Sequence, residues 1–148
     1  MDGVITLYTI GFAHKSAREF FELLKKHGVK RIIDVRISNT SQLAGYTKKD
    51  DLKYFLKTIA DIDYVLRMDL APSEALYRKN KAKALKKEVF EALLREEYKN
   101  HEVEKAMTRE ELNRACLLCS EPDVTACHRS VAANYLCEAL GAIEVVDI

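Results

Sequence analysis

Short apolar runs, rich in β-branched residues, recur along the chain and predict buried strands. They extend over Val4 to Ile10, Arg31 to Arg36, Asp63 to Leu70, Ala115 to Cys119 and Ile143 to Ile148. Runs that are apolar on both faces are typical of parallel strands. Segments with helical spacing separate them, so the pattern predicts an α/β protein with a mostly parallel sheet of about five strands, covered by helices on both faces.

The predicted helices carry recognisable start and stop signals. Ser16 stands three residues before Glu19, which is the spacing of a capping box, and Gly28 is a plausible end for the helix that follows. Gly141 ends a later apolar stripe in the same way. The segment from Arg78 to Arg114 is long, highly charged and helix-prone.

Distinctive polar residues follow four of the predicted strands. They fall in Gly11 to His14, Asp34 to Gln42, Asp69 to Ser73 and Cys119 to Arg129. In an open α/β sheet, ligands bind beyond the carboxyl ends of the strands. The sequence therefore predicts that these polar residues lie together along one edge of the sheet, where a ligand would bind.

Composition narrows the class of protein. The chain has 148 residues, 48% hydrophobic and 32% charged, with a net charge of +1. This composition predicts one globular domain over residues 1–148. The net charge is too small to indicate nucleic acid or a membrane surface as the partner. No apolar segment approaches the roughly 20 residues that cross a bilayer. The first residues lack signal-peptide features, so we expect a cytoplasmic protein whose cysteines are mostly reduced.

The segment Leu117 to Ser130, LLCSEPDVTACHRS, admits three interpretations, of which the first is a metal site. Cys116 and Cys119, followed by Cys127 and His128, resemble a zinc pattern. However, positions three apart in a strand point to opposite faces, so the first two cysteines cannot share an ion. We therefore expect no metal. The chain also has no Walker A loop, GxGxxG or HExxH motif, so no cofactor is predicted.

The second interpretation is a thiol nucleophile at Cys119 or Cys127. Backbone N–H groups and the helix dipole lower a thiol pKa at a helix start. Alternatively, both cysteines pack as buried apolar residues, because cysteine is among the residues most often buried. Neither begins a phosphatase-like Cys-x5-Arg loop, since position 125 is Thr and position 133 is Ala. Cys116 and Cys137 are predicted to be core residues.

The third interpretation is an anion cradle at the start of a helix capped by Thr125 or Asp123. His128 and Arg129 would lie in its first turn. A cation there opposes the helix dipole, which favours an anionic ligand. The alternative is a structural ion pair in which Glu121 fixes Arg129 or His128.

Other residues at the predicted carboxyl edge of the sheet are further candidates for binding a ligand. Arg36 either pairs with Asp34 or forms a clamp with Arg129 for carboxylate or phosphate. Tyr46 either stacks on a ligand ring or covers the loop. The predicted ligand-binding set is Gly11, His14, Arg36, Asn39, Ser41, Gln42, Tyr46 and Arg129.

A basic run offers a different function. Its residues are Arg78, Lys79, Lys81, Lys83, Lys86 and Lys87. Such a run suggests a nucleic-acid surface. Because Glu88 and Glu91 follow at once, a solvated helix with internal ion pairs is the alternative.

Four stretches together resemble the DUF488 family of uncharacterised α/β proteins. They read YTIGFAHKSAREFFELLKKHGVKRIIDVR, NTSQLAGYTKKDDLKYFLK, LAPSEAL and LLCSE…CHRS, in order and nearly end to end. The positions that match the motifs are Thr9, Ile10, Gly11, Asp34, Val35, Arg36, Cys119, Glu121, Cys127, His128 and Arg129. The chain departs from many members at Phe12-Ala13, where they have His-Ser, and at Ser130, where they have Arg. The resemblance implies a three-layer α/β/α sandwich, but no established reaction.

These observations predict a small enzyme or binding protein for an anionic, phosphate- or nucleotide-like molecule. The predicted catalytic set is Cys119, Glu121, Cys127 and His128. Two alternatives remain, a nucleic-acid-associated module that uses the basic run and a structural or interaction protein without catalysis. The oligomeric state does not follow from the sequence.

Overall fold

A five-stranded parallel sheet forms the centre of the computed structural model, which describes residues 3–12, 15–36, 46, 48–82, 85–119 and 128–148. The strand order is β3-β2-β4-β1-β5. The strands are β1 (Ile5–Gly11), β2 (Arg31–Asp34), β3 (Asp63–Leu66), β4 (Ala115–Cys119) and β5 (Ile143–Asp147). Both the predicted fold class and the predicted number of strands are confirmed.

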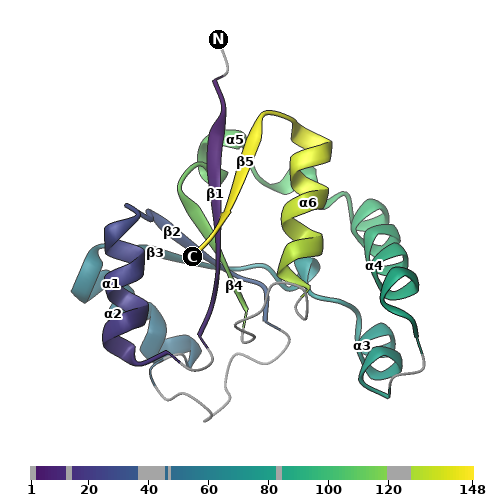
Figure 1. Ribbon diagram of the computed structural model, residues 1–148, viewed down its shortest axis with the longest axis horizontal. Helices are drawn as coiled ribbons and strands as arrows, with labels where there is room; N and C mark the ends of the chain where they lie inside the picture. Colours follow the sequence, from purple (N-terminus) through teal and green to yellow (C-terminus); the bar gives the residue numbers. More distant parts are fainter. Residues whose placement is uncertain (1–2, 13–14, 37–45, 47, 83–84, 120–127) are drawn as a thin grey trace.

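Helices cover the sheet on both faces, which gives three layers (Figure 1). On one face lie α1 (Ala17–Lys26) and α2 (Lys49–Ala60). The core on the other face takes residues from α3 (Glu74–Lys81), α4 (Lys87–His101), α5 (Arg109–Leu112) and α6 (Arg129–Leu140). Two short 3-10 helices, η2 (Met68–Leu70) and η3 (Val103–Ala106), join these elements.

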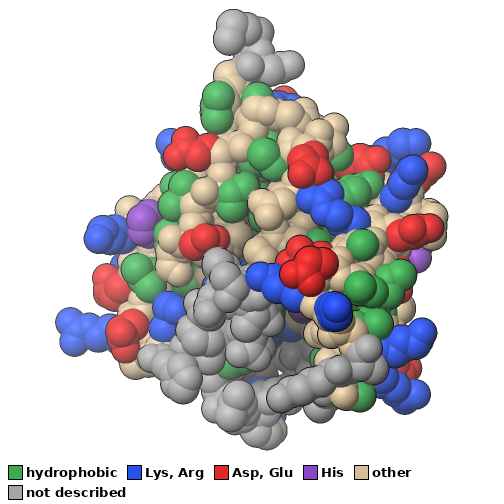
Figure 2. Space-filling model, turned by 45° about the vertical axis from the view of Figure 1, so that its right-hand side comes forward, with side chains coloured by type: hydrophobic (Ala, Val, Ile, Leu, Met, Phe, Trp, Pro, Cys, Tyr) green, Lys and Arg blue, Asp and Glu red, His purple; other side chains and the backbone are tan. Residues whose placement is uncertain are grey.

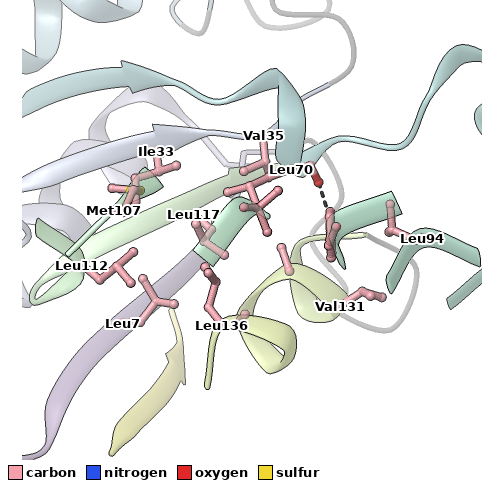
Figure 3. Packing of buried hydrophobic residues seen from close by; sticks show 14 of the residues in the cluster. Leu7, Ile33, Val35, Leu70, Leu94, Met107, Leu112, Leu117, Val131 and Leu136 are labelled. Carbon is pink, nitrogen blue, oxygen red and sulfur yellow. Dashed lines mark hydrogen bonds between the residues drawn. The ribbon is translucent and has the colours of Figure 1, made fainter. Parts of the chain in front are cut away.

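Strand β4 is central, and all five of its residues are buried. Successive side chains of a strand point to opposite faces. Leu117 therefore belongs to the core under α6, as Figure 3 shows, whereas Leu118 belongs to the core under α1 and α2. This two-sided burial explains why the strands are apolar throughout rather than alternating.

The predicted helix signals at both ends of α1 and at the end of α6 are confirmed. Ser16 and Glu19 form the reciprocal capping box at the start of α1. Gly28 follows the C-cap of this helix with a φ of 68°, and Gly141 ends α6 with a φ of 72°. Both values lie in the left-handed region, where only glycine has no steric penalty.

Two predicted segments differ from the structure. The strand predicted to run to Leu70 stops at Leu66, and η2 follows it. The backbone N–H of Arg67 still bonds to the carbonyl of Asp34, but the next residue, Met68, is 49% exposed and no longer buried like a strand of the core. The charged segment from Arg78 to Arg114 is helical only in pieces. One reason is that Glu102 adopts a left-handed conformation, with a φ of 50°, and ends α4. Within the described residues, no helix has the length and apolar character that crossing a membrane requires.

Candidate active site at the carboxyl edge of the sheet

The carboxyl ends of β1 and β4 meet at a topological switch point. The two strands are neighbours, with Gly11 paired to Cys119. From β1 the chain continues to α1 on one face, and from β4 it continues to α6 on the opposite face. The connections therefore diverge, and such a divergence opens the crevice in which α/β sheets bind ligands. The residues that follow these two strands are the first candidates for a site.

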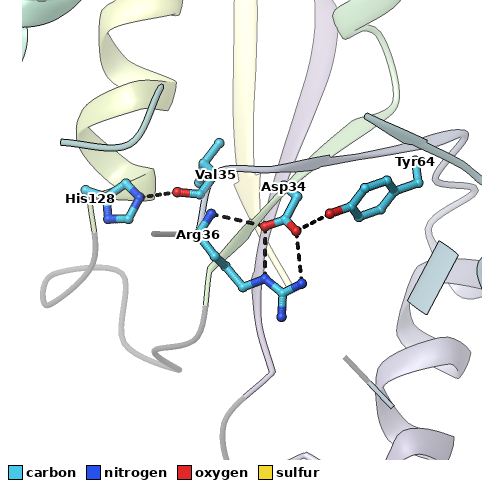
Figure 4. A network of polar contacts seen from close by, with 5 residues as sticks. All are labelled: Asp34, Val35, Arg36, Tyr64 and His128. Atoms are coloured by element: carbon cyan, nitrogen blue, oxygen red, sulfur yellow. Dashed lines mark hydrogen bonds and ion pairs between the residues drawn. The ribbon is translucent and has the colours of Figure 1, made fainter. Parts of the chain in front are cut away.

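A buried ion pair lies at the end of β2, next to this crevice. The guanidinium of Arg36 donates two hydrogen bonds of 2.9 Å from Nε and Nη2 to the carboxylate of Asp34 (Figure 4). The side chains are 3% and 0% exposed. The hydroxyl of Tyr64 also donates to Asp34, and burial, with the neighbouring carboxylate, raises the pKa of this phenol.

The predicted pairing of Arg36 with Asp34 is thus confirmed, while its clamp with Arg129 stays a prediction. The ring of Phe12 lies under the guanidinium, at 5.6 Å from its centroid, and holds it from a second side. In Figure 4 the remaining guanidinium nitrogen points away from Asp34. Arg36 is therefore fixed in place by the fold, with one nitrogen directed elsewhere.

His128 is held in one tautomer by the backbone of the same region. Its Nε2 lies 2.5 Å from the carbonyl oxygen of Val35 (Figure 4). Because a carbonyl oxygen only accepts, Nε2 carries the proton, and Nδ1 of the neutral ring is left as an acceptor. Burial lowers the pKa of His128, the carbonyl of Val35 opposes this effect, and the charge of Arg129 lowers the pKa further. The ring is therefore a neutral base at pH 7.

The lowered pKa of His128 predicts a pH dependence of stability. The unfolded chain takes up a proton at the ordinary value of about 6.5, whereas the folded protein does so only at lower pH. The free energy of unfolding should therefore decrease as the pH falls from 6.5 towards the folded pKa. Urea denaturation of wild type and His128→Gln across this range should show a smaller pH dependence in the variant. Equal curves for wild type and His128→Gln would contradict this prediction.

Arg129 is the first residue of α6 and is only 1% exposed. The N-cap residue of this helix is His128, which makes no side-chain capping bond, so the prediction of Thr125 or Asp123 as the cap is wrong. The predicted position of Arg129 in the first turn is confirmed. A cation at this position opposes the helix dipole, and here it is also buried.

Lys15 is a site residue that the sequence analysis did not single out. Its Nζ donates a 2.7 Å hydrogen bond to the carbonyl of Gly11, at the carboxyl end of β1. Burial lowers the pKa of Lys15, the charge of Arg129 lowers it further, and Glu19 partly opposes both effects. The signal was present in the sequence, since Lys15 directly precedes the capping box of a predicted helix. A cation at this helix start opposes the helix dipole, as Arg129 does at the start of α6.

The described cysteines differ in state. Cys116 and Cys137 carry free thiols, and both pack with the cores, as predicted. Burial raises the pKa of Cys116. Cys119 is 4% exposed and is disulfide-bonded. A nucleophilic thiolate at Cys119 would therefore require prior reduction.

Comparison with known proteins identifies the family. The family model described as "Domain of unknown function DUF488" matches residues 16–136. This chain belongs to the DUF488 family. No curated protein and no solved structure matches the chain. Membership of the DUF488 family therefore supplies no reaction.

Several predicted site residues of this DUF488 protein lie outside the described residues. They are His14, Asn39, Ser41, Gln42, Glu121 and Cys127. The structure brings together Gly11, Arg36, His128 and Arg129 around the ends of β1, β2 and β4. Tyr46 lies beside them, because its hydroxyl donates a 2.9 Å hydrogen bond to the carbonyl of Lys15. The ring of Tyr46 packs on Phe20 and Phe21.

The basic run of the DUF488 protein is divided between α3 and the start of α4, and Lys83 lies outside the described residues. Arg78 forms an exposed ion pair with Glu74, one turn earlier on α3. Acidic and basic side chains are interspersed over the face of the molecule in Figure 2, which brings the α3 and α4 side forward. Such mixing is typical of a solvated surface, and a nucleic-acid role of this run stays a prediction.

Proposed function

We propose that this DUF488 protein binds an anionic small molecule, with a phosphate-like group, at the carboxyl edge between the loops that follow β1 and β4. One observation carries the proposal. Lys15 and Arg129 each lie at the start of a helix beside the switch point, close enough for the charge of Arg129 to lower the pKa of Lys15. Two like charges held together at two helix starts favour a bound anion.

Arg36 forms its ion pair with Asp34, and the cations that lie at the two helix starts are Lys15 and Arg129. In this proposal these two cations face the anionic group. Arg36 would orient the ligand through the nitrogen that is not bound to Asp34, because Phe12 and Asp34 fix the guanidinium. A planar, preorganised guanidinium suits carboxylate and phosphate oxygens.

His128 would act as a general base in this site. Its Nε2 proton is committed to the carbonyl of Val35, so Nδ1 would take a proton from the ligand or from a water molecule. A ring that is neutral at pH 7 is in the correct form for this role. Cys119, Glu121 and Cys127 complete the proposed catalytic set, in which Cys119 would act as a nucleophile only after reduction of its disulfide.

Arg129→Met tests the proposed site, because it keeps most of the side-chain volume and removes the charge. We expect inorganic phosphate to raise the melting temperature of the wild type at constant ionic strength. Arg129→Met should bind phosphate at least about tenfold more weakly, which corresponds to about 1.4 kcal/mol, as measured by calorimetric titration. Lys15→Met should weaken phosphate binding as well.

The matched control is Lys53→Met on the exposed side of α2, which should bind phosphate like the wild type. A wild type that shows no response to phosphate would contradict the proposal. If Arg129→Met also lost about 3–5 kcal/mol of stability without phosphate, Arg129 would be a structural partner of the fold, as in the pairing with Glu121.

A further inference from the structure

A groove with a cavity volume of about 350 Å³ runs between α1 and α2, on the face of the sheet opposite α6. Arg18, Phe21 and Lys25 line it from α1, Phe55 and Ile59 line it from α2, and Tyr46 closes one side. Cavities of this size that are lined mostly by apolar and aromatic side chains, with a few polar groups, are typical of small-molecule sites.

The aromatic wall of the groove is fixed before any ligand binds. The ring centroid of Phe21 lies 6.0 Å from that of Tyr46 and 6.4 Å from that of Phe55. Phe21 is 5% exposed, and the hydroxyl of Tyr46 is bound to the carbonyl of Lys15. In contrast, Ile59 is 46% exposed and presents an apolar side chain to solvent at the groove. A flat apolar ligand would cover it without rearranging the wall.

The charged residues of the groove favour an acidic ligand. Arg18 and Lys25 are seven residues apart on α1, so they lie two turns apart on one side of the helix. Among the described residues that line the groove, Glu22 is the acidic one. Within the described part of the chain, neither Arg18 nor Lys25 forms an ion pair. The cationic pair therefore complements a carboxylate or sulfonate at the mouth of an apolar pocket.

We infer that the groove between α1 and α2 is a second binding site, which takes a flat aromatic ring that carries a carboxylate or a sulfonate. The ring would lie against Phe21, Phe55 and Ile59, and the acidic group would face Arg18 and Lys25. This site is distinct from the carboxyl-edge site, which depends on Lys15, Arg129 and His128. Among the described residues, Tyr46 belongs both to the groove and to the ligand-binding set predicted from the sequence.

Calorimetric titration with 1-naphthoate tests the apolar part of the inference. We expect the wild type to bind this probe and Ile59→Glu to bind it at least about tenfold more weakly, because a carboxylate then occupies the apolar wall and repels the probe. Leu93→Glu is the matched control, since Leu93 is 40% exposed on α4 and lies away from the groove, and it should bind like the wild type. Ala17→Glu is a second variant that places a carboxylate in the groove, so it should also weaken binding of 1-naphthoate. Because an acidic residue in the first turn of α1 favours the helix, this variant should stay folded.

The charge requirement is tested with 1-naphthamide, which has the same ring without the negative charge. Arg18→Gln with Lys25→Gln should weaken binding of 1-naphthoate to the level of the amide and leave binding of the amide unchanged. Phosphate binding should be the same in the wild type and in Ile59→Glu, which separates this inference from the proposed function.

Three results would overturn the inference: no binding of 1-naphthoate to the wild type, equal binding by Ile59→Glu and Leu93→Glu, or no loss in Arg18→Gln with Lys25→Gln. Sedimentation equilibrium gives a further criterion. A wild-type dimer that Ile59→Glu dissociates would mean that the groove is occupied by a second copy of the chain, and it too would overturn the inference.

Discussion

Asp34→Ala should lower the free energy of unfolding by about 3–5 kcal/mol, the largest effect that we expect from any single substitution at the carboxyl edge. The variant leaves the guanidinium of Arg36 buried, at 3% exposure, without the carboxylate that receives two of its hydrogen bonds. It also removes the acceptor of the Tyr64 hydroxyl. The cost arises mainly from the uncompensated buried charge, because the ion pair itself contributes little net stability against an apolar pair.

Urea denaturation of three variants separates the charge from the packing. Asp34→Ala should be far less stable than Asp34→Leu combined with Arg36→Met, which removes both charges and keeps much of the volume. Glu74→Ala is the control, because it breaks the exposed pair with Arg78, and we expect no measurable change from it. If the double variant were as unstable as Asp34→Ala, packing rather than charge would be the cause.

Leu117→Ala and Leu118→Ala should each lower the free energy of unfolding by about 2–5 kcal/mol. The two side chains are neighbours in β4 and are both 0% exposed, but they lie in the separate cores on the two faces of the sheet. Each substitution leaves a cavity in a different core. Similar losses for the two variants are therefore expected only of a sheet that is covered on both faces.

The same denaturation measurement on Leu93→Ala provides the control, because Leu93 is 40% exposed on α4. Its loss should be well below those of the two β4 variants. A small loss for either Leu117→Ala or Leu118→Ala, comparable to that of Leu93→Ala, would mean that one face of the sheet is open to solvent. It would contradict the three-layer arrangement.

Arg36 has a different role in the structure from the one that the sequence suggested. From spacing alone, pairing with Asp34 and a clamp with Arg129 were alternatives. In the structure the pairing is formed and buried, and it fixes the guanidinium without engaging all of its nitrogens. In the proposed function, Lys15 and Arg129 are the cations that face the ligand, and of these two the sequence pointed only to Arg129.

Local patterns determined the elements of this protein. The length and two-sided apolar character of β1 and β4, the capping box of Ser16 and Glu19, and the glycine that ends α6 are properties of a few consecutive residues, so they could be predicted from the sequence. The family and the location of polar residues after the strands followed in the same way. Local patterns did not predict where β3 ends, because η2 replaces the predicted continuation of the strand. At such a position the backbone conformation depends on residues that are distant in the sequence.

The tertiary structure alone decided which strand ends meet. The sequence does not contain the order β3-β2-β4-β1-β5, because pairing between strands that are more than a hundred residues apart depends on how whole layers pack. That order brings Lys15, after β1, to the same edge of the sheet as Arg129, after β4, where the charge of Arg129 lowers the pKa of Lys15, and it brings His128 to the carbonyl of Val35, after β2. The tautomer of His128, the burial of Arg129 and the interaction of the two cations are all consequences of this long-range packing, which no local pattern encodes.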